Sequence, residues 1–150
     1  FKYSVQCGVF KIHEEHHPER YNHYKNLSDT TINWELMKYP AGSCDIQRFE
    51  DNNKGIISVN VYEIQTKLDS HESITLHRRT HVINAKYHVN LLLIDDGDGK
   101  NHYVYVKDYD KLVGGQTNKH KNKLFHCRYC QHGFKRENLL TKHMDAGCLA

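Results

Sequence analysis

Residues 125–148, with the sequence FHCRYCQHGFKRENLLTKHMDAGC, contain four side chains of the kinds that bind metal ions. Cys127, Cys130, His143 and Cys148 follow the pattern C-x(2)-C-x(12)-H-x(4)-C. Zinc prefers four thiolate and imidazole ligands arranged as a tetrahedron. Two Cys residues that flank a tight turn can both reach one ion, and a His and a Cys five residues apart face the same side of a helical turn. The spacing therefore predicts one structural Zn²⁺ ion held by these four residues.

Three apolar residues between the ligands predict a minimal core for the same segment. Phe125 precedes the first Cys, Phe134 follows the second Cys, and Leu140 precedes the His. A segment this short cannot bury enough apolar surface to fold without the metal. The pattern resembles the ββα zinc finger of the two-Cys two-His type, with Cys148 in place of the second His. Because thiolate also binds zinc well, the replacement leaves the finger subtype open and the metal unchanged.

Composition limits the classes to which the chain can belong. The 150 residues allow one ordinary domain and a small module, and the sequence has no apolar run of membrane-spanning length and no secretory signal. The first residue is Phe, which favours a fragment of a longer protein. Three of the five Cys residues belong to the finger, and Cys7 and Cys44 do not form a disulfide framework. We therefore expect an intracellular protein, in the nucleus rather than the cytoplasm, without a membrane or an evident small-molecule substrate.

The positive charge is concentrated at the C-terminal end. Residues 116–150 hold 7 Lys and Arg against 2 Asp and Glu, a net charge of +5, whereas residues 1–115 hold 14 against 16. This asymmetry favours a polyanionic partner. A small module that keeps itself soluble with lysines would explain the charge equally well.

Periodicity predicts an α+β fold, in which N-terminal helices pack on a small antiparallel sheet and a ββα zinc finger follows. We expect an α+β domain over residues 1–114, a basic linker over 115–123 that begins with Gly-Gly, and the finger over 124–150. The sequence predicts an opening helix from Phe1 to Ile12, a short helix over 19–27 and a helix over 44–53 capped by Ser43. It also predicts strands over 57–64, 73–80, 89–94 and 102–107, and a helical turn over 108–112.

Four segments carry a second resemblance, which covers most of the chain from about residue 45. They are DIQRFEDNNKGIISVNVYEI (45–64), HVNLLLI (88–94), HYVYVKDYDKLV (102–113) and TNKHKNKLFHCRYC (117–130). Together they are similar to a region of large proteins of animal mobile elements, of the Polinton/Maverick kind that encodes a family B DNA polymerase. The resemblance implies a mobile-element context in which the finger follows an α+β domain.

The order of a helix and a later strand hairpin is also similar to the papain-like layout. There, a Cys at a helix N-terminus is deprotonated by a His on a neighbouring strand. The candidates are His102 as the base, with Cys7 or a residue before Phe1 as the nucleophile. Cys7 falls inside the predicted helix, which argues against activation by the helix dipole, and a third residue to orient the imidazole is missing. We therefore expect an incomplete papain-like domain or a different α+β fold, with hydrolase activity as the alternative function.

Counting back from His143 gives the finger residues that would face DNA. Arg136, Leu139 and Lys142 fall at the base-contacting positions, and Leu139 cannot hydrogen-bond a base edge. One finger covers about 3 base pairs, so non-specific phosphate contact is the better prediction. The candidate nucleic-acid-binding residues are Lys119, Lys121, Lys123, Lys135, Arg136 and Lys142. A protein partner, or a purely structural finger, remains the other interpretation.

Overall fold

The computed structural model describes residues 1–25, 27, 30–66, 68, 72–95, 97–117 and 122–148. The chain divides into two compact units. The first consists of residues 1–64 and 75–107, and the second of residues 65–74 and 108–150.

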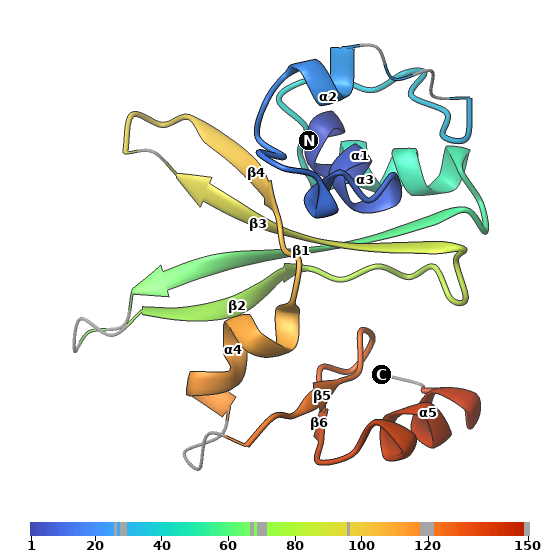
Figure 1. The fold of residues 1–150 in the computed structure, drawn as a ribbon, viewed down its shortest axis with the longest axis vertical. Coiled ribbons are helices and arrows are strands. Elements are labelled where there is room, and N and C mark those ends of the chain that lie inside the picture. Colours follow the sequence, from blue (N-terminus) through green and yellow to red (C-terminus); the bar gives the residue numbers. More distant parts are fainter. Residues whose placement is uncertain are drawn as a thin grey trace. The chain divides into compact units, whose positions relative to one another are not determined.

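A four-stranded sheet, which lies in the first unit except for residues 65–66 and 72–74, has the strand order β2-β1-β3-β4 (Figure 1). These strands are β1 (Ile57–Thr66), β2 (Glu72–Arg78), β3 (Tyr87–Asp95) and β4 (Asn101–Tyr105). β3 and β4 pair antiparallel, as the sequence predicted, with Leu93 opposite Tyr103. β1 and β3 pair parallel, with Val59 opposite Val89. The prediction of an antiparallel sheet is therefore wrong for this pair, and the sheet is mixed.

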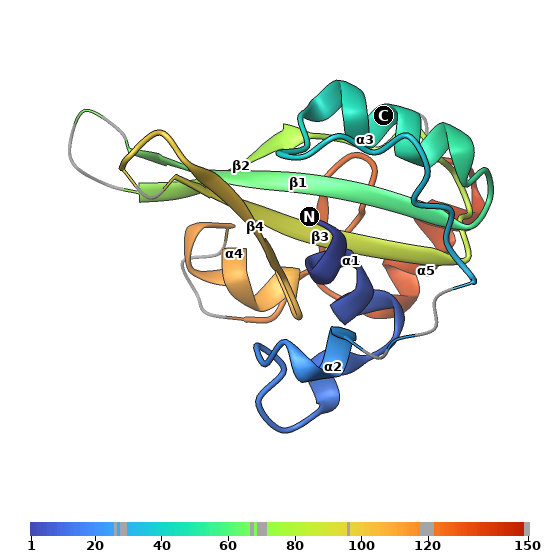
Figure 2. The same cartoon turned by 90° about the horizontal axis from the view of Figure 1, so that it is seen from above.

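One face of the sheet carries the main core, and α1 (Lys2–Val9) and α3 (Ser43–Asn52) cover it (Figures 1 and 2). Alternation along β1 turns every second side chain to this face. The helix residues of the core are Val5, Val9, Ile46 and Phe49, and its strand residues are Ile57, Val59, Val61, Val89 and Leu91. Gly8 allows the closest approach of α1 to β4, because a Cβ atom there would lie 2.6 Å from the Tyr105 ring.

The helices of the first unit differ in detail from their predicted ranges. α1 ends at Val9 rather than Ile12, because Lys11 adopts a left-handed conformation and a short 3₁₀ helix, η1 (Ile12–Glu14), follows. The second predicted helix is shortened to α2 (Asn22–Lys25). α3 begins one residue earlier than predicted, and Ser43 is its first residue rather than its cap. Its N-cap is Gly42, whose N–H donates to the Asp45 carboxylate at 2.9 Å.

A buried ion pair connects α3 to the sheet. Glu50 is completely buried, and its carboxylate accepts hydrogen bonds from the Arg78 guanidinium, from the Thr80 hydroxyl and, at 2.9 Å, from the Val59 N–H. Arg78 also donates to the Val59 carbonyl at 2.8 Å. Because every oxygen of the buried carboxylate has a donor, the charge is compensated inside the unit.

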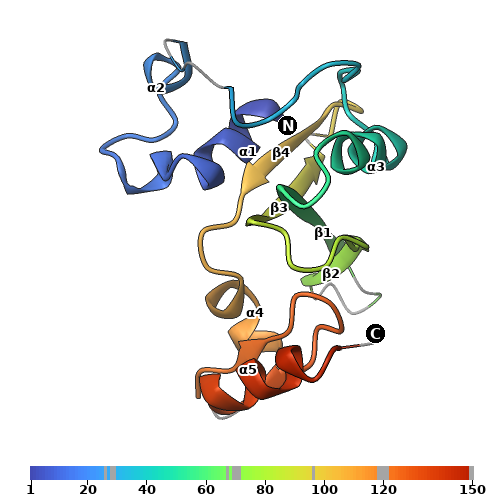
Figure 3. The same ribbon diagram turned by 90° about the vertical axis from the view of Figure 1, so that its right-hand side faces the viewer.

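The second unit contains α4 (Tyr109–Thr117), the short strands β5 (Phe125–His126) and β6 (Gly133–Phe134), and α5 (Glu137–Asp145) (Figure 3). β5 and β6 form an antiparallel hairpin in which Phe125 lies opposite Phe134. α4 is longer than the predicted turn over 108–112, and it extends through residues 115–117 of the predicted linker. Residues 118–121 of that linker lie outside the described residues.

Val113 explains why the Gly-Gly pair does not end α4. Its side chain is completely buried, so the helix has an apolar anchor directly before Gly114. Burial of this kind outweighs the weak helix propensity of glycine.

Among the described residues, no helix combines the length and the apolar character needed to cross a membrane.

Candidate metal centre

The structure brings together the four residues that the sequence spacing predicted as ligands. One potential ligand atom from each of Cys127, Cys130, His143 and Cys148 lies within 4.8 Å of all the others. The Cys130 sulfur and the His143 Nε2 atom lie 3.4 Å apart. These residues come from the turn between β5 and β6, from α5 and from the segment after α5.

Backbone hydrogen bonds shape the turn that carries the first two Cys residues. The Cys127 N–H donates to the His132 carbonyl, and the Gln131 N–H donates to the Cys127 carbonyl, both at 2.9 Å. Gln131 adopts a left-handed conformation, with φ of 65°. The chain therefore reverses tightly after Cys130, and both sulfurs remain on one side of the turn.

α5 supplies the imidazole and directs the chain toward the last Cys. His143 lies in the last turn of α5, and its ring packs on Phe134 with a centroid distance of 5.0 Å. Beyond α5, Gly147 adopts φ of 81°, a conformation that glycine reaches without strain. This reversal brings Cys148 back to the cluster.

The surroundings of Cys127 favour the form of the side chain that binds metals. Burial of the thiol opposes ionisation, but backbone N–H groups of Cys130 and Tyr129 point at the sulfur, and the pKa of Cys127 is lowered from its ordinary value. The Tyr129 nitrogen lies 3.4 Å from this sulfur. Since the thiolate is the ligand, a lowered pKa prepares the site for a cation.

The four donor atoms fit a metal ion with tetrahedral coordination. In a zinc tetrahedron with Zn–S bonds of about 2.3 Å, neighbouring sulfurs lie roughly 3.8 Å apart. Separations within 4.8 Å are compatible with that geometry after small side-chain adjustments. Three sulfurs and one imidazole nitrogen are soft or borderline donors, which suit zinc better than calcium or magnesium. The four residues can therefore hold a metal ion.

Four of the six candidate nucleic-acid-binding residues lie within the described part of the chain. Lys135, Arg136 and Lys142 are exposed at the start and along one face of α5. Lys123 is also exposed, and its ammonium group lies 4.9 Å from the centroid of the Phe125 ring. α5 begins at Glu137, as the sequence count assumed. Lys119 and Lys121 lie outside the described residues.

The structure does not bring Cys7 and His102 together. Cys7 is buried in the middle of α1, and burial raises the pKa of its thiol, although the Tyr24 hydroxyl opposes part of this effect. His102 is exposed on β4, and alternation turns it away from Tyr103 and Tyr105, which face α1. The candidate pair of the papain-like hypothesis therefore lacks the contact that a nucleophile and its base require.

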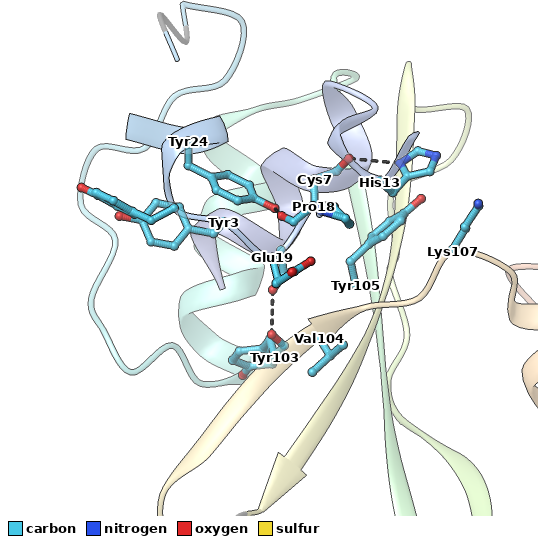
Figure 4. A pocket seen from close by; sticks show the side chains of 12 residues that line it. Tyr3, Cys7, His13, Pro18, Glu19, Tyr24, Tyr103, Val104, Tyr105 and Lys107 are labelled. Atoms are coloured by element: carbon cyan, nitrogen blue, oxygen red, sulfur yellow. Dashed lines mark hydrogen bonds between the residues drawn. The ribbon is translucent and has the colours of Figure 1, made fainter. Parts of the chain in front are cut away.

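A pocket of about 620 Å³ adjoins Cys7 in the first unit (Figure 4). The histidine beside Cys7 is His13, whose Nδ1 atom lies 3.2 Å from the Cys7 carbonyl oxygen and whose ring packs on Tyr105. Tyr24 forms another part of the wall, and its hydroxyl donates to the Pro18 carbonyl at 2.8 Å. His13 therefore contacts the backbone of Cys7 rather than its sulfur.

Sequence reasoning missed Asp110 and its contact with His126, the residue that directly precedes Cys127. The Nδ1 atom of His126 lies 2.7 Å from an oxygen of Asp110. Asp110 belongs to α4, so no ligand spacing or short motif relates it to the finger. The adjacency of His126 to Cys127 was the available signal.

A scan against protein-family models, a search of curated proteins and a search of solved structures each return no match to this chain.

Proposed function

We propose that the second unit is a zinc-stabilised finger of the ββα type and that it binds nucleic acid non-specifically. The observation that carries the proposal is the convergence of three Cys sulfurs and one His nitrogen within 4.8 Å, on a hairpin followed by a helix. Zinc is the ion that this donor set favours, and its role here is to hold the unit together rather than to catalyse a reaction.

Exposed positive side chains support the nucleic-acid partner. Lys135 and Arg136 directly precede α5, and Lys142 lies about one and a half helical turns from its start. None of the three makes an ion pair with a described residue, so their charges are available for phosphate oxygens. Arg136 can pair with a phosphate or a guanine through two N–H groups, whereas Leu139 offers no hydrogen bond to a base. The proposal is therefore for weak, salt-dependent binding without sequence preference.

The proposal extends to the context of the chain. The four segments that resemble proteins of Polinton/Maverick elements support an origin in a mobile-element protein. A protein that acts on the DNA of such an element would need to bind nucleic acid without sequence preference.

Fluorescence anisotropy with a labelled duplex and a labelled single strand tests this function. For the zinc-loaded chain we expect the logarithm of the binding constant to fall with the logarithm of the salt concentration, with a slope of about −3 to −4 if four phosphates are contacted. The triple change Lys135→Ala, Arg136→Ala and Lys142→Ala should reduce the slope by about 3 in magnitude.

The matched control is Lys54→Ala, which removes an exposed positive charge from the first unit and should leave binding unchanged. Undetectable binding at about 50 mM salt, or binding that does not respond to salt, would refute the nucleic-acid partner. A protein partner would then become the better interpretation of the finger.

A further inference from the structure

Asp110 makes two hydrogen bonds to the residue that precedes the first metal-ligand Cys. The same carboxylate oxygen accepts from the backbone N–H of His126 at 2.9 Å and lies 2.7 Å from its Nδ1 atom. Because a carboxylate only accepts, the Nδ1 atom is the donor in the second contact. The His126 side chain is only 3% exposed, so these contacts are shielded from water.

These contacts fix the backbone where the chain enters the metal-binding turn. His126 is bonded directly to Cys127, whose N–H then donates to the His132 carbonyl. Tyr109, the neighbour of Asp110, packs its ring edgewise against His126 at 5.5 Å between centroids. A Cβ atom on Gly133 would come within 3.2 Å of the His126 ring, so β6 closes tightly over the same side chain. The position of the Cys127 sulfur thus depends on the helix that holds His126.

Burial and hydrogen bonds also fix the C-terminal half of α4. Val113 is completely buried, and the Gln116 side chain makes two hydrogen bonds with the backbone of Ile74, one to its N–H at 2.9 Å and one to its carbonyl at 2.7 Å. All of these residues belong to the second unit. α4 is therefore braced between the β2 segment at Ile74 and the hairpin of the finger.

We propose that Asp110 is a positioning residue of the metal centre and that the module which binds zinc includes α4, beyond the finger segment 124–150. This inference rests on the proposed zinc site. Removing a residue that hydrogen-bonds to a metal ligand typically lowers metal affinity about 10- to 100-fold. Since Asp110 acts through the residue next to a ligand, we expect an effect near the lower end of that range.

Zinc affinity of the full chain, measured by competition with a chromophoric chelator, tests the inference. Asp110→Ala should weaken zinc binding about tenfold, and Asp110→Asn, which keeps an accepting oxygen, should recover most of the loss. The control is Lys111→Ala, which removes an exposed side chain from the residue next to Asp110, keeps a residue of good helix propensity in α4 and does not touch His126. It should bind zinc within about threefold of the unchanged chain.

The absorption spectrum of the Co²⁺-loaded chain distinguishes a displaced metal ligand from loss of the folded site. At saturating Co²⁺, Asp110→Ala should still show the absorption of a tetrahedral ion with three thiolates, with altered intensity. Unchanged zinc affinity of Asp110→Ala, or an equal loss in Lys111→Ala, would overturn the role of Asp110 while the zinc site stands. If the unchanged chain binds no zinc, both the proposed function and this inference fail.

Discussion

The Nε2 atom of His143 lies 3.4 Å from the sulfur of Cys130, although twelve residues separate them in the sequence. One residue belongs to the β5–β6 turn and the other to α5, so their proximity needs both elements to be formed. A thiolate sulfur and an imidazole nitrogen are both atoms of the kinds that bind zinc.

Removing the imidazole should therefore damage the site far more than removing a neighbouring one. We expect His143→Ala to weaken zinc binding by roughly 100-fold or more, since structural zinc sites contribute about 10–16 kcal/mol through four ligands. The matched control is His132→Ala, because His132 is exposed and lies outside the ligand cluster. Competition titration with a chelator measures both, and equal affinities would remove His143 from the ligand set.

Chelation should unfold the second unit and leave the first unit intact. The core of the first unit contains only residues of that unit among those described, and the single Trp of the chain, Trp34, stacks on Phe49 within it at 5.0 Å between centroids. After EDTA treatment, hydrogen exchange should accelerate for amides of β5, β6 and α5.

The fluorescence of Trp34 should not change in the same samples. If the chelator shifts the emission of Trp34 as well, the first unit depends on the metal. Unaltered exchange in the second unit would instead show that its fold needs no metal.

Glu50 should be the most sensitive polar position of the first unit. Glu50→Ala leaves the Arg78 guanidinium buried without its carboxylate partner, and we expect a loss of about 3–5 kcal/mol in the free energy of unfolding. The neighbouring change Asp51→Ala removes an exposed carboxylate and should cost within about 0.5 kcal/mol. Urea titration followed by Trp34 fluorescence compares the two, and similar midpoints would argue against the buried pair.

Burial and metal binding should determine the order in which the Cys thiols react with a thiol reagent. Cys44 is exposed, whereas burial raises the pKa of Cys7, so at pH 7.5 a thiol reagent should modify Cys44 first. The thiolate is the reactive form, so labelling of Cys7 should become appreciable only at a pH above that needed for Cys44. Peptide mass spectrometry of the zinc-loaded chain, with and without His102→Ala, measures this order.

The substitution should not alter the labelling of Cys7, because the structure does not bring the two side chains together. Rapid labelling of Cys7 that His102→Ala abolishes would instead revive the hydrolase hypothesis.

Local patterns predicted the candidate centre well, because they reflect local chemistry. The distance along the chain between Cys127 and Cys130 decides whether both can reach one ion, and the period of α5 decides which way His143 points. The β3–β4 hairpin was predictable for the same reason, since a short turn joins its strands.

Contacts between distant segments were not predictable in this way. Apolar and polar residues alternate along β1, whereas β3 carries an apolar run. Neither pattern indicates that the two strands pair parallel. The Gly-Gly pair at 114–115 predicted a linker, but burial of Val113 and the contacts of Gln116 with Ile74 maintain a helix there. Asp110 was missed because its partner, His126, lies sixteen residues away in another element.

Metal analysis combined with X-ray absorption tests the central claim most directly. For the purified chain we predict one zinc ion per molecule, coordinated by three sulfurs at about 2.3 Å and one nitrogen at about 2.0 Å. A chain that contains no stoichiometric zinc, or a zinc environment with fewer than three sulfurs, would contradict the account.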